Sequence, residues 1–163
     1  MSKVLRAGVI GLGMGRNHIR GFQSHPDCEV VAVSDISEPA LKQTGDEYNV
    51  PNRYTDHRKM LDKENLDIVS IATPNILHKP QALDALKAGA HVLCEKPMAM
   101  NAKEANDMIR AAKKTDRRLM INFSFRFKEQ SWAIKRQIER GRLGDIYMAR
   151  TVWHRRRGFP KFG

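Results

Sequence analysis

The 163-residue sequence lacks long apolar runs and contains only two cysteines. Its apolar runs reach only a few residues, whereas a helix that crosses a membrane needs about 20. Residues 1–3 lead straight into an expected strand, without the apolar region of a signal peptide. We therefore expect a cytoplasmic protein that has no membrane partner.

The two cysteines, Cys28 and Cys94, do not have the paired spacing of metal-binding cysteines. Both lie in or beside expected strands of a chain whose hydrophobic content, 41%, is typical of a globular protein. Free, buried thiols are therefore expected rather than a disulfide. The sequence predicts neither redox chemistry at cysteine nor a metal site.

Acidic residues are scarce in the last third of the chain. Residues 111–163 hold 15 lysines and arginines but only four aspartates and glutamates, and the whole excess behind the net charge of +11 lies there. Clustered cations can mark a nucleic-acid surface, but these are scattered through helix and strand patterns without a recognisable module. We expect no specific nucleic-acid partner, and salt-dependent retention of DNA or RNA by this stretch is the alternative.

Short β-rich runs alternate with amphipathic stretches, which is typical of βαβ units. We therefore predict an α/β fold with a mostly parallel sheet. Helix ends are marked by Ser37 before Pro39, by Asn101 with Glu104, and by Gly89. Strands are expected at 4–10, 30–34, 52–54, 67–72, 91–94 and 119–123, and helices at 15–25, 39–48, 56–62, 77–88 and 102–115.

The pattern changes after Phe123. Residues 131–140 are typical of a helix, Gly141 and Gly144 of a turn, and residues 145–154 alternate like a strand. A long strand needs neighbours, and the remaining residues, ending in RRRGFPKFG, are too few to supply them. We therefore expect that a second domain opens after Phe123 and that its remainder is missing. Its exposed apolar side chains should include Trp132, Ile134, Ile138, Met148 and Val152.

The stretch GLGMGRNH, residues 11–18, nearly matches the glycine fingerprint of a dinucleotide-binding turn. Its glycines are Gly11, Gly13 and Gly15, with Arg16 where the third glycine of the fingerprint belongs. A helix that begins near Gly15 would place this residue on the same face as His18, toward the sheet. We therefore interpret the motif as a turn one residue shorter that binds a pyrophosphate, the alternative being a glycine-rich turn that binds nothing.

Asp35 lies at the end of the second expected strand, 22 residues after Gly13. A carboxylate there accepts hydrogen bonds from the adenosine ribose and repels a 2′-phosphate, which favours NAD over NADP. The alternative is an aspartate that only caps the next helix.

Two further loops follow expected strands at the same edge of the sheet. The first is IATPNILH, residues 71–78, which would contact a ligand there. The alternative is a loop whose Thr73 and Asn75 side chains only form hydrogen bonds with nearby backbone groups. CEKPMAM, residues 94–100, places Lys96 where an ammonium can hydrogen-bond a substrate hydroxyl and favour its alkoxide. The alternative is a solvated lysine.

Taken together, GVIGLGMGRNH, Asp35, IATPNILH, CEKP and INFSFRF resemble the N-terminal part of the Gfo/Idh/MocA oxidoreductases. This is the family of glucose-fructose oxidoreductase and inositol dehydrogenases. The resemblance covers essentially the whole chain, and the ordered set of motifs is specific although each motif alone is not.

The resemblance implies an NAD(P)-dependent oxidoreductase that transfers hydride between a nicotinamide and a carbinol or carbonyl carbon of a sugar, polyol or related compound. It implies Lys96 as the catalytic and substrate-binding lysine and Arg126 as a further substrate contact. It also implies a Rossmann domain with a doubly wound parallel sheet at 1–122, the start of a truncated α/β substrate domain at 123–163, and a homo-oligomer when the protein is complete. The implied cofactor-binding residues are Gly11, Gly13, Met14, Gly15, Asp35, Thr73, Pro74, Asn75, His78, Glu95 and Asn122.

One departure from the family concerns catalysis. Its Asp-x-x-x-His motif, whose histidine is the usual general acid/base, would lie beyond Gly163. We therefore expect the 163-residue chain to bind NAD(H) with little turnover. A stand-alone NAD-sensing or interaction module is the alternative hypothesis.

Overall fold

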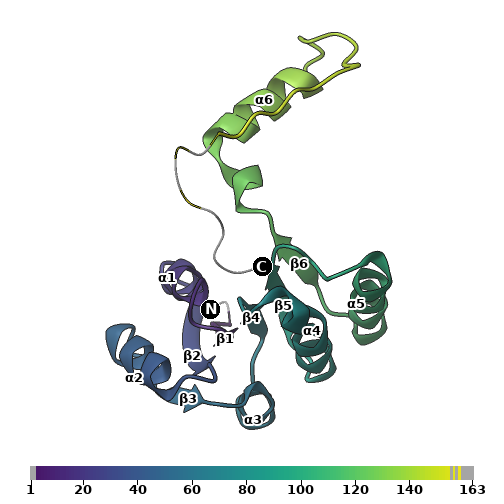
Figure 1. Cartoon of the computed structure of the whole chain (residues 1–163). Coiled ribbons are helices and arrows are strands. Elements are labelled where there is room, and N and C mark those ends of the chain that lie inside the picture. Colours follow the sequence, from purple (N-terminus) through teal and green to yellow (C-terminus); the bar gives the residue numbers. More distant parts are fainter. Residues whose placement is uncertain (1–2, 155, 157, 159–163) are drawn as a thin grey trace. The chain divides into compact units, whose positions relative to one another are not determined.

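The computed structural model describes residues 3–154, 156 and 158. The chain divides into two compact units, Met1–Asn122 and Phe123–Gly163 (Figure 1). Apart from Arg156 and Gly158, the C-terminal run that begins at Arg155 lies outside the described residues.

The first unit is built on a six-stranded sheet in the order β3-β2-β1-β4-β5-β6. Every pairing is parallel, so the predicted doubly wound sheet of the Rossmann type is confirmed. The strands are β1 (Leu5–Ile10), β2 (Cys28–Ser34), β3 (Asn52–Tyr54), β4 (Ile68–Ile71), β5 (His91–Glu95) and β6 (Leu119–Asn122).

Helices connect the strands, and each predicted helix is present with ends within two residues of those expected. They are α1 (Gly15–Gln23), α2 (Glu38–Glu47), α3 (His57–Lys63), the 3₁₀ turn η1 (Asn75–Leu77), α4 (His78–Lys87) and α5 (Ala102–Thr115). Within the described ranges, none of the helices is both long and apolar enough to cross a membrane.

Two apolar clusters form the core. Successive strand residues alternate between them: Val9 of β1 packs in a cluster with residues of α1 and α2, and Ile10 packs in one with residues of α3, α4 and α5. Because neighbouring strand residues point to opposite faces, the helices cover both faces of the sheet (Figure 1). Burial on both faces explains why the strands are apolar runs in the sequence.

The helix ends form as their residues predict. The Ser37 side chain accepts a hydrogen bond from the Ala40 N–H, and the Asn101 side chain accepts one from the Glu104 N–H at 3.0 Å. Gly89 ends α4 with a φ of 88°, which favours glycine, and its N–H donates to the Leu86 carbonyl. Side-chain caps of this kind set where α2 and α5 begin.

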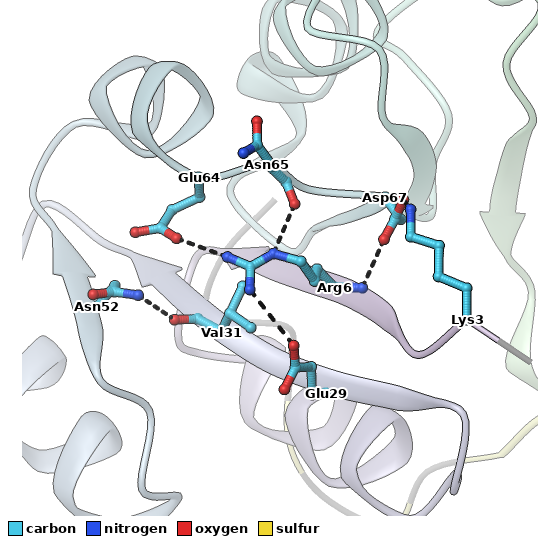
Figure 2. Close-up of polar contacts among 8 residues, drawn as sticks. All are labelled: Lys3, Arg6, Glu29, Val31, Asn52, Glu64, Asn65 and Asp67. Carbon is cyan, nitrogen blue, oxygen red and sulfur yellow. Dashed lines mark hydrogen bonds and ion pairs between the residues drawn. The ribbon is translucent and has the colours of Figure 1, made fainter. Parts of the chain in front are cut away.

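A charged cluster joins β1 to β4 at the amino edge of the sheet. The Arg6 side chain donates to the Asn65 carbonyl at 2.9 Å and to the Glu64 carboxylate at 3.2 Å. The Asp67 carboxylate accepts from the Arg6 N–H and the Lys3 ammonium. Figure 2 shows Arg6 between these groups. The cluster lies opposite the strand ends at which the predicted site residues gather.

The second unit contains the 3₁₀ turn η2 (Ser124–Phe127) and α6 (Glu129–Glu139). The Phe125 and Trp153 rings pack edge to face with centroids 5.1 Å apart. Gly141 and Gly144 have φ values of 66° and 59°, as expected of turn glycines. The predicted exposure is confirmed for Trp132, Ile134, Ile138, Met148 and Val152.

The strand predicted at 145–154 was wrong. These residues form neither helix nor strand in the structure. Alternation alone predicts only that one face of a segment is apolar. A strand also needs a partner for its backbone N–H and carbonyl groups, and no described residue supplies one here.

Candidate functional site at the carboxyl edge of the sheet

The carboxyl ends of β1, β4 and β5 are neighbours, because β1 pairs with β4 and β4 pairs with β5. The chain order reverses at β1, since β2 and β3 lie on one side of it and β4 to β6 on the other. Ligands of open α/β sheets bind at such a switch point. The predicted cofactor residues lie at the carboxyl ends of β1, β2, β4, β5 and β6 or in the segments that follow these ends.

Two glycines of the turn after β1 are required by contacts within the protein. Gly11 has a φ of 86°, and a Cβ there would lie 2.7 Å from the Ala72 carbonyl oxygen. A Cβ on Gly15 would lie 2.8 Å from the Val9 Cγ1 atom. Gly15 therefore lets α1 pack closely on its strand, as the helix phase predicts.

The turn also presents unused hydrogen-bond donors. The first N–H groups of a helix have no carbonyl partner within the helix, and those of residues 13–16 make no hydrogen bond of good geometry with another described residue. The first turn of α1 contains no acidic residue, and Met14 at its N-cap supplies no side-chain cap. A Cβ added to Gly13 would meet no atom within 4 Å. This open, donor-rich helix start fits a phosphate group.

Asp35, directly after β2, braces the turn from the other side. One carboxylate oxygen accepts from the Leu12 N–H at 2.8 Å, and the other accepts from the Ser37 N–H at 2.9 Å. The two interpretations of Asp35, as a cap of the next helix and as a ligand-binding carboxylate, are therefore compatible. Asp35 stabilises the segment before α2, and each of its oxygens still has a lone pair for a further donor.

The loop after β4 is held together by buried side chains. The Thr73 hydroxyl donates to the Gln81 side chain at 2.6 Å. His78 is fully buried, and its ring nitrogens lie 2.9 Å from the Thr73 carbonyl oxygen and 2.7 Å from the Pro97 carbonyl oxygen. Pro74 is exposed and Asn75 is half-buried. His78 therefore acts on the shape of the loop, whereas Pro74 and Asn75 are open to a ligand.

The ends of β5 and β6 meet around His18 of α1. The Glu95 carboxylate lies 2.9 Å from the His18 Nε2 atom and accepts from the Asn122 amide at 2.7 Å. The other ring nitrogen, Nδ1, contacts the hydroxyl of Ser70, a fully buried residue of β4. Glu95 and Asn122, predicted separately, are thus brought into one network.

The two predicted substrate residues lie in different units. Lys96 follows Glu95, its side chain is exposed, and within the described part of the chain that side chain makes no hydrogen bond or ion pair. Arg126 lies in η2 of the second unit, where its N–H donates to the Phe123 carbonyl at 2.8 Å.

Both cysteines are free thiols. Burial, together with the nearby Glu95 carboxylate, raises the pKa of Cys94 to about 12. Burial also raises the pKa of Cys28. Across residues 3–154, 156 and 158, no group of three His, Cys, Asp or Glu side chains is placed to hold a metal ion. The thiols stay protonated at neutral pH, which makes them poor nucleophiles.

Sequence reasoning did not include His18, Ser70 or Gln81 among the site residues. For His18 a signal was available, since the helix phase already placed it on the sheet-facing side with Gly15. Ser70 and Gln81 give no such signal, because a serine in a strand and a glutamine in a helix are ordinary at those positions. Their partners are identified only by the fold.

The strand order, the glycine turn and the acid after β2 together define a dinucleotide-binding Rossmann domain. The model of the oxidoreductase family with an NAD-binding Rossmann fold, GFO_IDH_MocA, matches residues 5–123. The chain belongs to this family, as its motifs predict.

Named relatives in this family are dehydrogenases. The chain is 34% identical over 164 residues to D-glucoside 3-dehydrogenase of Escherichia coli, covering 99% of this chain and 47% of that protein. It is 31% identical over 149 residues to myo-inositol 2-dehydrogenase of Thermotoga maritima, covering 91% of this chain and 45% of that one. The chain thus spans a little under half the length of these relatives.

Solved structures show the same fold. The WlbA dehydrogenase from Bordetella pertussis, in complex with NADH and UDP-GlcNAcA, superposes with a TM-score of 0.83 at 32% identity. The match covers 90% of this chain and 45% of that one. An oxidoreductase from Agrobacterium radiobacter in complex with NAD+ superposes with a TM-score of 0.84 at 26% identity, covering 88% and 42%.

Proposed function

We propose that this chain is the nucleotide-binding part of an NAD-dependent oxidoreductase that acts on a sugar, a polyol or a related compound. The observation that carries the proposal is the helix start at residues 13–16, which combines free backbone N–H groups with open space above Gly13. The relatives' named activities support the reaction class. They give no support to a module that only binds NAD.

In this proposal the turn of Gly11, Gly13, Met14 and Gly15 holds the pyrophosphate through its N–H groups. Asp35 accepts hydrogen bonds from the ribose hydroxyls with its remaining lone pairs.

The middle and the nicotinamide end of the cofactor would meet the next two loops. The loop of Thr73, Pro74 and Asn75 contacts the middle of the cofactor, and buried His78 holds this loop through the Thr73 carbonyl. Glu95 and Asn122 define the nicotinamide end.

When bound, the nicotinamide supplies or accepts the hydride. The exposed ammonium of Lys96 hydrogen-bonds the substrate oxygen and stabilises its developing negative charge. Arg126 is a second substrate contact. The proton would be moved by a histidine outside this chain, so we expect little turnover from these 163 residues alone.

We further propose a small hydroxylated substrate, a homo-oligomer for the complete protein, and a cytoplasmic location without a nucleic-acid or membrane partner. Two protonated, unpaired thiols are in keeping with a reducing compartment. The proposal that no specific nucleic acid binds can be tested on residues 111–163, which contain the excess of basic side chains. Weak, sequence-independent retention of DNA that salt abolishes would mark these cations as mere charge.

Titration of the purified chain with NADH, followed by cofactor fluorescence, tests the proposal. Saturable binding is expected, and no binding at about 1 mM NADH would refute nucleotide binding, since specific cofactor sites reach affinities well below this concentration. The D35A variant is the diagnostic partner, because it removes the ribose acceptor and the charge that repels a 2′-phosphate.

For D35A we expect NADH binding to weaken about tenfold or more, and the preference for NADH over NADPH to fall. The matched control is D62N, which changes an exposed carboxylate on α3. An unchanged ratio of the NADH and NADPH dissociation constants in D35A would contradict the role of Asp35.

A further inference from the structure

Each neighbour of Lys96 in the chain contacts a buried histidine, on one side through a side chain and on the other through a backbone carbonyl. Glu95, which precedes it, contacts His18 of α1, and the carbonyl of Pro97, which follows it, contacts His78 of α4. The two histidines are 8% and 0% exposed, and both contacts are partly buried. Lys96 itself is exposed.

On the preceding side, the carboxylate of Glu95 has three partners. It lies 2.9 Å from the His18 ring, accepts from the Asn122 amide at 2.7 Å and accepts from the Lys96 N–H at 3.2 Å. The last contact ties the peptide of Lys96 directly to the network. The Glu95 side chain is therefore held by residues of two elements, His18 of α1 and Asn122 of β6.

On the following side, His78 bridges two loops of the candidate site. Its Nδ1 atom faces the Pro97 carbonyl at 2.7 Å, and its Nε2 atom faces the Thr73 carbonyl at 2.9 Å. Carbonyl oxygens only accept hydrogen bonds, and a neutral imidazole carries a single N–H, so the neutral ring donates to one of these carbonyls and makes only a close contact with the other. An apolar side chain of the same size would leave both loops without this connection.

The contacts of His18 also resemble a serine–histidine–carboxylate triad, since its Nδ1 atom contacts the Ser70 hydroxyl and its Nε2 atom contacts the Glu95 carboxylate. Such a triad needs a serine hydroxyl that can reach a substrate. Ser70 is fully buried in β4 and so is no nucleophile. The role that fits the burial is to fix the ring of His18.

We propose that His18 and His78 are positioning residues that clamp the backbone at Lys96 and thereby aim its side chain at the substrate. This inference rests on the proposed function of Lys96 as the substrate-binding lysine. Functional side chains act only within a narrow range of positions, and buried hydrogen bonds to the neighbouring residues supply that restraint. A free loop would leave Lys96 to sample orientations in which its ammonium misses the substrate oxygen.

The test uses H78F and H78Q in the 163-residue chain. Phenylalanine keeps a ring and removes the N–H donor, whereas glutamine keeps an amide that donates. Amide hydrogen exchange is measured by mass spectrometry for peptides that cover residues 94–100, beside urea denaturation of each variant. The matched control is H91F, because His91 accepts from the Arg118 N–H at the opposite end of the same strand, β5.

We expect H78F to speed exchange at residues 94–100 about tenfold, while peptides of β2 keep wild-type rates. H78Q should restore much of this protection, and H91F should leave residues 94–100 unchanged. A general rise in exchange across the whole first unit, or equal rates in H78F and H78Q, would overturn the proposal.

The variants H18L and H18Q test the same restraint at the other histidine, and they provide the test if H78F does not fold. Leucine should loosen residues 94–100 more than glutamine does, and equal exchange in the two variants would overturn the role of His18. NADH titration of the unmodified chain separates this inference from the proposed function. Absent NADH binding refutes the function, whereas intact binding with unchanged exchange in the variants refutes the clamp alone.

Discussion

Three glycines of the turn after β1 satisfy three different physical demands. Gly11 has a backbone conformation with a positive φ, and Gly15 leaves room for the Val9 side chain. Gly13 has neither constraint, because its φ is not positive and a Cβ there would meet nothing. We propose that glycine at this position lets a ligand approach the backbone closely.

Alanine substitutions separate these demands. We expect G13A to unfold in urea like the wild type but to bind NADH about tenfold more weakly, since a methyl group would occupy the ligand's space. We expect G15A to lose about 1–3 kcal/mol of stability because its methyl group overlaps Val9. The control in the same helix is G21A, where a Cβ meets nothing and alanine should stabilise α1.

Urea denaturation and NADH fluorescence measure the two effects independently. A G13A variant that binds NADH with wild-type affinity would show that the space above the turn does not receive the nucleotide. A G15A variant as stable as G21A would show that α1 can shift away from β1 without cost.

At the scale of elements, the charged cluster at the amino edge ties β1 to β4, the two strands on either side of the switch point (Figure 2). The hydrogen bond from the Arg6 N–H and that from Lys3 lower the pKa of Asp67. A carboxyl group with a lower pKa in the folded state than in the unfolded state stabilises the fold above its unfolded value, near 3.9. That contribution is lost as the pH falls through the folded value.

We therefore expect D67N to be less stable than the wild type at pH 7, and the difference to shrink steadily below about pH 4. Urea denaturation between pH 7 and pH 3 measures it. The control is D62N, whose carboxylate makes no hydrogen bond or ion pair among the described residues. A stability difference for D67N that stays constant with pH would contradict a role for the charge of Asp67.

Local signals explain how much of the element pattern could be predicted. The strands are buried on both faces and so are apolar runs, and Ser37, Asn101 and Gly89 mark helix ends through contacts that span at most four residues. The prediction of a strand at 145–154 was wrong because a strand does not depend on local signals alone. Its formation depends on a partner strand, and alternation within the segment carries no information about that partner.

At the scale of the whole molecule, the two units differ in how they bury apolar side chains. The first unit has two buried clusters on a six-stranded sheet. In α6 of the second unit, no residue is buried, and Trp132 and Ile134 are exposed. Stability that arises from apolar burial therefore resides in the first unit.

We expect a shortened chain of residues 1–125 to fold cooperatively and to bind NADH within about threefold of the full chain, since the nucleotide contacts proposed here lie in the first unit. This length keeps Asn122 clear of the new C-terminus. Thermal unfolding and NADH titration of both chains give the comparison. A loss of NADH binding on shortening would show that residues 126–163 contribute to the nucleotide site.

The strands of the sheet, the helices, the glycine turn and the acid after β2 could be predicted from the sequence, because patterns of neighbouring residues mark each of them. The network of His18, Glu95 and Asn122 follows from the fold alone, since His18 lies 77 residues from Glu95 and 104 residues from Asn122 along the chain. The fold likewise places His78, fully buried, between the loops that contain Thr73 and Pro97. Hydrogen bonds between distant residues depend on how elements pack, and local sequence patterns do not encode that packing.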